Sequence, residues 1–273
     1  MQDPSHDSLR TGGAGRRIRL DFGNLPLVEA AVRVSLESPI PLRFATINRV
    51  KERLASEFST LEEPTQFEIP PGLPGPLPPF HPGQIPGAVY GGNPQGLTVT
   101  LQNQVIVARW LKEATQNGRE YPRFQSLSSV LWKSTEAIES TLDQELPRII
   151  VANVSYVNFL KVPHTAPVLS HYFSEAAHVK AALGAQQVLR VGASWREHDA
   201  IDLRFELAQV TAEVGDETIE GYRLTTAAGT RLTERDNPQQ SLDNVHTKLQ
   251  VFFSTLISRR AKEEWQLREV PLE

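Results

Sequence analysis

Two kinds of periodicity follow one another along this chain, and they do so twice in the same order. Residues 28–36 alternate between apolar and polar side chains, which is the period of a strand with one buried face. Apolar residues then recur at helical intervals in residues 43–58, a pattern typical of an amphipathic helix. The second half begins in the same way, with a strand predicted at residues 148–162 and a helix at residues 169–183. This repeated order constrains the fold more than any single motif does.

Antiparallel strands and a long helix complete each half. The first half has a predicted hairpin at residues 97–110 and a helix at residues 124–144, which begins after Pro122. Three strands are predicted in the second half, at residues 188–197, 201–213 and 218–226. A helix follows at residues 241–265, with Ser241 as the expected N-cap. We therefore predict an α+β fold of two pseudo-repeated halves, each a curved antiparallel sheet packed by a long helix, as in TATA-binding-protein-like or helix-grip folds.

A proline-rich segment interrupts the first half. Half of the chain's 20 prolines lie between residues 64 and 94. Proline lacks a backbone N–H group and restricts φ, so we predict that this segment is neither helix nor central strand. It could be a polyproline II ligand for an SH3-like partner, but we favour a long loop over the domain. The predicted organisation is a disordered tail at residues 1–19, a first half at 20–146 and a second half at 147–273.

Composition excludes several kinds of site. The chain of 273 residues has no cysteine, so disulfides, thiolate nucleophiles and cysteine-bound zinc are excluded. The net charge of −4 argues against a protein that mainly coats phosphates, although it is compatible with a local basic patch. No apolar run approaches the ~18 residues of a membrane helix, and no N-terminal apolar segment resembles a signal peptide. We expect a cytoplasmic protein with no membrane association and no cofactor.

The first candidate binding region joins the predicted hairpin to the first long helix. Basic and aromatic residues alternate there, namely Arg109, Trp110, Arg119, Tyr121 and Arg123. Basic groups interleaved with stacking aromatics are what single-stranded nucleic acids require. The alternative is a sheet-to-helix junction, in which Arg109 and Trp110 point to opposite faces of a strand and the other aromatics pack beside Pro122. We favour the junction, with nucleic-acid contact as the second hypothesis.

Two polar residues on the first strand of the second half form another candidate. Tyr156 and Asn158 share a face with the apolar Val154 and Leu160, so this face should be buried. An unpaired buried amide costs about 1–3 kcal/mol, so Asn158 should hydrogen-bond to backbone or to a neighbouring side chain. The functional alternative is that Tyr156 and Asn158 orient a small-molecule ligand. His246, beside the apolar stripe of the last helix, is either a hydrogen-bonded histidine at the edge of the core, which we favour, or a ligand contact.

A metal site has one candidate. His171, Glu175 and His178 are spaced i, i+4 and i+7, which would place them on one face of a helix. Two imidazoles and a carboxylate can bind a divalent metal ion, but polar residues at this spacing more often form a solvated face. The sequence also lacks a Gly-x-Ser-x-Gly elbow, a P-loop and a His-Glu-x-x-His motif. We expect neither a metal nor an enzymatic activity.

Several segments together resemble a known family. They are FGNLPLVEAAVRVSL at residues 22–36, REYPRFQSL at 119–127, VANVSYVNFL at 151–160 and LDNVHTKLQVFFSTL at 242–256. The combination is similar to sporadically distributed, uncharacterised microbial proteins of about this length. Those proteins carry a Pro-Leu-Val-Glu strand, a Tyr-Pro motif before a helix and a Tyr-Val-Asn strand. Their patchy occurrence is typical of mobile or defence-associated genes, so the resemblance implies a context and no particular chemistry.

These observations lead to one functional expectation and two alternatives. We expect a non-enzymatic cytoplasmic interaction protein with a protein partner, in a mobile or defence-associated module. Self-association as a homo-oligomer is compatible with the sequence. The first alternative is a single-stranded nucleic-acid-binding protein that uses the region from Arg109 to Arg123. The second is a small-molecule-binding protein with a pocket between the sheet and a long helix.

Overall fold

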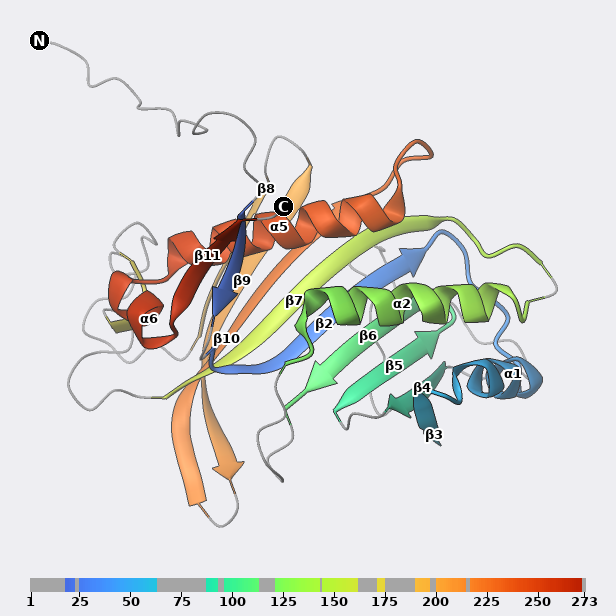
Figure 1. The fold of residues 1–273 in the computed structure, drawn as a ribbon, viewed down its shortest axis with the longest axis horizontal. Coiled ribbons are helices and arrows are strands. Elements are labelled where there is room, and N and C mark those ends of the chain that lie inside the picture. The colour runs from blue at the N-terminus through green and yellow to red at the C-terminus, as the bar shows by residue number, and fades with distance from the viewer. Residues whose placement is uncertain are drawn as a thin grey trace, which may run out of the picture.

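The computed structural model describes residues 18–22, 25–62, 87–92, 96–112, 121–142, 144–161, 171–174, 190–196, 200–214 and 217–271. Within these residues the chain forms one nine-stranded sheet, a separate two-stranded sheet and a small number of helices (Figure 1). Every registered pair of strands is antiparallel. The predicted α+β class with a large antiparallel sheet is thereby confirmed.

The nine-stranded sheet has the order β3-β4-β5-β6-β2-β7-β10-β9-β8. Its strands are β2 (Leu27–Leu36), β3 (Phe58–Glu62), β4 (Gly87–Gly92), β5 (Leu97–Gln102), β6 (Val105–Leu111), β7 (Ile149–Lys161), β8 (Arg190–Arg196), β9 (Ile201–Val214) and β10 (Glu217–Arg231). Strand β2 pairs with β7, so strands from both parts of the sequence belong to one continuous sheet. The two-stranded sheet pairs β1 (Ile18–Phe22) with β11 (Leu267–Pro271).

The two longest helices lie on the same side of the large sheet (Figure 1). The helices are α1 (Phe44–Leu54), α2 (Arg123–Glu139), α5 (Pro238–Leu256) and α6 (Arg259–Glu264). Helix α2 contacts β6, β2 and β5, whereas α5 contacts β7, β10 and β9. We call the side of the sheet that α2 and α5 contact the helix face, and the opposite side the outer face. Among the described residues, no helix has the length and apolar character that crossing a bilayer requires.

Period-2 alternation decides which strand residues enter the core. Val32 of β2 lies opposite Val154 of β7 and Ala108 of β6, and all three point to the helix face and are buried. A large hydrophobic cluster joins these strands to α1, α2 and the first part of α5. A second cluster joins β7, β9 and β10 to the end of α5 and to Trp265 after α6. Most of the core therefore lies between the helices and one face of the sheet, and a third, small cluster of Ala31, Val105 and Val107 lies on the outer face.

Several helix boundaries differ from the sequence prediction. The helix predicted at residues 43–58 ends at Leu54, and Phe58 begins β3. The last helix begins at Pro238 because Asn237 is the N-cap: its side chain accepts a 3.0 Å hydrogen bond from the Gln240 N–H. The expected cap Ser241 is inside the helix. An Asn-Pro pair is a strong start signal, since asparagine caps the first turn and proline fits its first position.

The single helix predicted to run to residue 265 is two helices. Helix α5 ends at Leu256, and Ser258 begins a new cap by accepting a hydrogen bond from the Ala261 N–H at 3.0 Å. Ile257, between the helices, has extended backbone and forms a β-bridge with Phe173. The hydrophobic period continues through this break, which is why the sequence pattern did not reveal it.

The prediction that residues 64–94 contain no central strand is wrong at β4. Gly87–Gly92 pairs with β3 on one side and β5 on the other. Pro86 and Pro94 flank these six residues, so every residue of the strand has a backbone N–H group to donate. Tyr90 is fully buried, and its hydroxyl donates to the carbonyl oxygen of Ile47 at 3.2 Å. Residues 63–86 and 93–95, which hold the remainder of the predicted loop, lie outside the described residues.

Gly96, just before β5, is expected to tolerate no side chain. Its φ is +86°, and a Cβ there would lie 2.2 Å from the carbonyl oxygen of Leu111. We expect Gly96→Ala to lower the melting temperature, because it combines left-handed backbone strain with this backbone overlap. Gly192→Ala on β8 is the control, since its Cβ would meet its nearest atom at an ordinary 3.5 Å. Equal melting temperatures for both variants in a thermal unfolding scan would contradict this account.

Candidate functional site

The first predicted binding region is divided between the two faces of the sheet. Trp110 points to the helix face and is buried, whereas Arg109 points to the outer face. The Arg109 Nε lies 3.2 Å from Glu29 Oε1 on β2. Consecutive residues of a strand alternate in direction, so these two side chains do not share a surface. Arg119 lies outside the described residues.

The aromatic residues of this region gather under the N-terminus of α2. The ring of Tyr121 lies 5.5 Å from that of Trp110 and 6.1 Å from that of Tyr156. The hydroxyls of Tyr121 and Tyr156 are 3.3 Å apart. Phe124, in the first turn of α2, stacks on His246 of α5 with ring centroids 3.7 Å apart. These contacts connect β6, β7 and both long helices inside the core, so the rings are not a platform that faces solvent.

Arg123 differs from the aromatic residues because it is exposed. It is the first residue of α2 and has a φ of +74°, which costs a non-glycine residue on the order of 1–3 kcal/mol. Burial raises the pKa of Tyr121, while its hydrogen bond with Tyr156 and the charge of Arg123 partly oppose that rise. Burial raises the pKa of Tyr156 as well. Both hydroxyls are therefore neutral near neutral pH.

His246 is buried in the middle of the cluster. Its ring stacks on Phe124 and meets Tyr156 edge-on at 6.2 Å. Burial lowers the pKa of His246 from 6.5 to about 3, so the ring is neutral near neutral pH. The contacts of His246 within the described residues are thus ring contacts, and the hydrogen bond that we expected from the sequence stays a prediction. A stacked, neutral imidazole is poorly arranged for proton transfer to a substrate in solvent.

Asn158 is fully buried on the helix face, where the strand pattern placed it. Neither its Nδ2 nor its Oδ1 has a hydrogen-bond partner among the described residues, contrary to our expectation. Thr226 of β10 is also buried, and its Oγ1 likewise has none there. The sequence analysis did not single out Thr226, which is the last residue of the strand predicted at residues 218–226.

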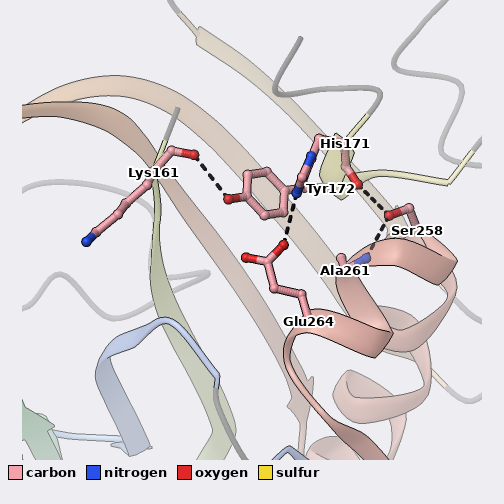
Figure 2. Close-up of polar contacts among 6 residues, drawn as sticks. All are labelled: Lys161, His171, Tyr172, Ser258, Ala261 and Glu264. Atoms are coloured by element: carbon pink, nitrogen blue, oxygen red, sulfur yellow. Dashed lines mark hydrogen bonds and ion pairs between the residues drawn. The ribbon is translucent and has the colours of Figure 1, made fainter. Parts of the chain in front are cut away.

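A second polar cluster surrounds His171 (Figure 2). Residues 171–174 lie against the turn between α5 and α6. The Ser258 N–H donates to the Tyr172 carbonyl oxygen at 2.8 Å, and the Ser258 hydroxyl donates to the carbonyl oxygen of His171. His171 is buried, and its Nε2 lies 3.0 Å from Oε2 of Glu264 on α6. Sequence reasoning could not reveal this pair, because 93 residues separate its members.

Stacked aromatic rings support this cluster. Tyr172 lies between His171, at 4.5 Å, and Trp265, at 5.5 Å, and Trp265 stacks in turn on Phe253. The Tyr172 hydroxyl donates to the carbonyl oxygen of Lys161 at the end of β7, at 3.1 Å. Residues 171–174 are thus attached to α5, α6 and the sheet by packing as well as by hydrogen bonds.

The predicted metal ligands are only partly within the described chain. Glu175 and His178 lie outside it, as does most of the helix predicted at residues 169–183. Inside that range, His171 and Tyr172 are helical, whereas Phe173 is in a β-bridge. Within the described residues, no group of three or more histidine, aspartate or glutamate side chains could hold a metal ion. His171 faces Glu264, so the described part of the chain gives it a carboxylate partner and no third ligand.

The outer face of the sheet carries most of the charged strand residues. Among residues with described side chains, the basic ones are Arg33, Arg109, Lys161, Arg196, Arg204, Arg223 and Arg231, and the acidic ones are Glu29, Glu62, Asp202 and Glu206. Arg109 forms an ion pair with Glu29, and Arg196 forms one with Asp202. The hydrogen bond from Arg196 lowers the pKa of Asp202. Arginines nevertheless outnumber carboxylates on this face, although the whole chain has a net charge of −4.

Small side chains occupy the centre of the outer face. In one row across the sheet, Arg204 and Arg109 lie at the two ends, with Ala227, Ser155 and Ala31 between them. Four strand spacings of ~4.8 Å place the two arginine positions ~19 Å apart. Ser155 and Ala227 are half-buried, and the Arg204 side chain is exposed. Ala31, by contrast, is 2% exposed and belongs to a small buried cluster with Val105 and Val107. The accessible part of this row is therefore Arg204, Ala227 and Ser155, on β9, β10 and β7.

Fold and sites together define an α+β protein with a nine-stranded antiparallel sheet, two buried polar clusters and an arginine-rich outer face. No protein-family model matches the sequence, and no curated protein matches it significantly. The family resemblance described above therefore stays a prediction.

Proposed function

We propose that this chain is a non-enzymatic interaction protein that binds an acidic segment of a protein partner on the outer face of its sheet. The observation that carries the proposal is the accessible part of this row, in which the small residues Ala227 and Ser155 lie beside the exposed Arg204. Small central side chains let the backbone of a partner approach the sheet. Arginines beside them suit its carboxylates, because guanidinium groups form paired hydrogen bonds with them.

The architecture that we propose for this surface is pseudo-twofold and TATA-binding-protein-like. Strands β2 and β7 pair at the centre, β6 and β10 flank them, and β5 and β9 follow. Helices α2 and α5 come directly after β6 and β10 in the chain. This order supports two related halves, and it favours two long helices on one sheet over a helix-grip fold. Within these halves, a partner would reach the outer face at β7, β10 and β9, where the described side chains are half-buried or exposed.

Single-stranded nucleic acid is the second candidate, and the arginines of the outer face favour it. Phosphates and carboxylates both suit guanidinium groups, so charge alone does not separate the two classes of partner. Base stacking does separate them, because single strands require accessible aromatic rings. Trp110, Tyr121 and Tyr156 point to the helix face and pack in the core. Among the described strands, Phe159 is the aromatic residue on the outer face, so the acidic protein segment is the better fit.

Charge reversal at Arg204 and Arg223 tests this surface. Both side chains are exposed on the outer face, on β9 and β10. We expect Arg204→Glu with Arg223→Glu to weaken capture of the partner from its own host by about tenfold or more, because each reversal replaces an attraction with a repulsion. Quantitative mass spectrometry of the captured proteins, with and without nuclease, is the measurement.

The matched control is Arg49→Glu with Arg53→Glu, which changes the net charge equally on the exposed surface of α1. This control should retain the partner. A partner that is lost on nuclease treatment would favour the nucleic-acid hypothesis. A partner that binds the Arg204 and Arg223 variant as well as the unmodified protein would refute the outer-face surface altogether.

A further inference from the structure

Asn158 lies where the two hydrophobic clusters of the core meet. Along β7, Val154 belongs to the first cluster and Leu160 belongs to the second. Leu25 and Phe252 pack against both clusters. Asn158 is therefore a fully buried amide at an apolar junction, on the opposite side of the sheet from the proposed partner surface.

A β-bulge surrounds this amide with apolar residues. Leu27 pairs with Asn158 and Glu29 pairs with Val157, so Val28 is an extra residue in β2. The bulge turns Leu27 to the helix face, where it is buried beside Asn158. On the other side of β7, Leu224 lies directly opposite Asn158. Neither neighbouring side chain can hydrogen-bond to the amide.

Two polar residues of β10 are diagonal to Asn158 in the strand register, Tyr222 and Thr226, and the one with a buried polar atom that has no hydrogen-bond partner among the described residues is Thr226. It lies opposite Tyr156, so it is diagonal to Asn158 on the same face of the sheet. Diagonal positions are ~7–8 Å apart, and the structure has no direct hydrogen bond between these two side chains. One bridging molecule spans the gap, because two hydrogen bonds of ~2.8–3.0 Å reach across ~5.5–6 Å. Three polar atoms, Asn158 Nδ2 and Oδ1 and Thr226 Oγ1, are available to it.

We propose that Asn158 and Thr226 hold one small neutral molecule between β7, β10 and α5. It donates a hydrogen bond to Asn158 Oδ1, and it accepts from Asn158 Nδ2 or from the hydroxyl of Thr226. The molecule is neutral because the surroundings are the leucines named above, the neutral Tyr156 and the neutral His246, and an unpaired charge there would be costly. Water and a small organic amide or alcohol share this chemistry.

The isosteric variant Thr226→Val tests for the bound molecule, because the melting temperature should fall if the molecule is present and rise if it is absent. If the hydroxyl binds a buried molecule, its removal is expected to lower the melting temperature by about 2–4 °C. If the hydroxyl is instead unpaired in a dry core, valine removes the cost of burying an unpaired polar group, so the melting temperature rises. Thr225→Val is the control, since Thr225 is half-buried on the outer face of the same strand and should change little.

A double-mutant cycle with Asn158→Leu tests whether one molecule joins the two side chains. Sites that share a bound molecule should be coupled, so the double variant is expected to lose less stability than the sum of the single losses. Additive effects would overturn the shared site, as would a rise in melting temperature for Thr226→Val. Thr226→Val is a conservative change, so its result stands even if Asn158→Leu does not fold.

The source of the molecule is identified separately. The protein is unfolded in denaturant, freed of small molecules on a desalting column and refolded in buffer alone. If the molecule is water, the refolded protein keeps its melting temperature and the effect of Thr226→Val. If it is an organic compound, the refolded protein melts earlier, and the denatured wash contains a neutral amide or alcohol in a stoichiometric amount by mass spectrometry. An unchanged melting temperature with no effect of Thr226→Val would contradict both sources.

Discussion

Replacing Trp265 with alanine is expected to lower the free energy of unfolding by about 3–5 kcal/mol, which is the usual cost of removing a buried tryptophan. Trp265 is 2% exposed and stacks on both Tyr172 and Phe253. Trp265 also follows α6 directly, and its backbone N–H donates to the carbonyl oxygen of Ala261. Truncation would leave a cavity where the second hydrophobic cluster meets residues 171–174.

Denaturant unfolding measures this loss, and hydrogen exchange shows where it acts. We expect faster exchange at the Ser258 and Ser174 amides, which donate to Tyr172 and Leu256 across the contact that Trp265 supports. Phe44→Ala is the matched control, because Phe44 is an aromatic residue that is 67% exposed and should cost little. Losses of equal size in the two variants would show that Trp265 does not hold this part of the core together.

Acid is expected to destabilise the protein through His246, beginning below pH 6.5. Burial lowers the pKa of the folded protein's His246 from 6.5 to about 3, so the unfolded chain takes up a proton that the folded chain does not. The folded protein therefore bears no cost from His246 above pH 6.5, and its free energy of unfolding falls as the pH drops from 6.5 towards 3. The slope between these limits is about 1.4 kcal/mol per pH unit for one group. The total is several kcal/mol, a large fraction of an ordinary stability.

The variant His246→Phe separates this effect from other titrations. Phenylalanine keeps a ring against Phe124 but cannot take up a proton, so the free energy of unfolding should vary less between pH 6.5 and 4.5. The pKa values of Asp202 and Asp236 are lowered below 3.8 by hydrogen bonds to Arg196 and Thr233, so those carboxylates contribute mainly at lower pH. Parallel pH profiles for the variant and the unmodified protein, from denaturant titrations, would exclude His246 as the cause.

Alternation and helical spacing predicted the elements whose side chains divide cleanly between core and solvent. The pattern gave β7 to within one residue at each end and put Asn158 on a buried face. It also placed Arg109 and Trp110 on opposite faces. These successes share a physical cause, because burial on one face imposes a period on the sequence.

Features that depend on distant partners could not be predicted in this way. The pair of His171 and Glu264 depends on the turn between α5 and α6, which the continuous hydrophobic period concealed. Strand β4 was missed because the prolines around it outweighed its six proline-free residues. The position of the Thr226 hydroxyl relative to Asn158 depends on the register of β10 with β7. The sequence of a single strand carries no information about that register.

The pairing of β2 with β7 sets a waiting time during synthesis. About 120 residues separate paired positions such as Val34 and Ala152, and a ribosome adds ~5–20 residues per second, so β2 waits about 6–25 s for its neighbour. Throughout that interval one edge of an apolar strand has no partner, and such edges invite pairing with other chains. Nascent chains that carry the first half are therefore the form of this protein that most needs chaperones. Folding should be slow for its size, because its central contact is among the most distant in the chain.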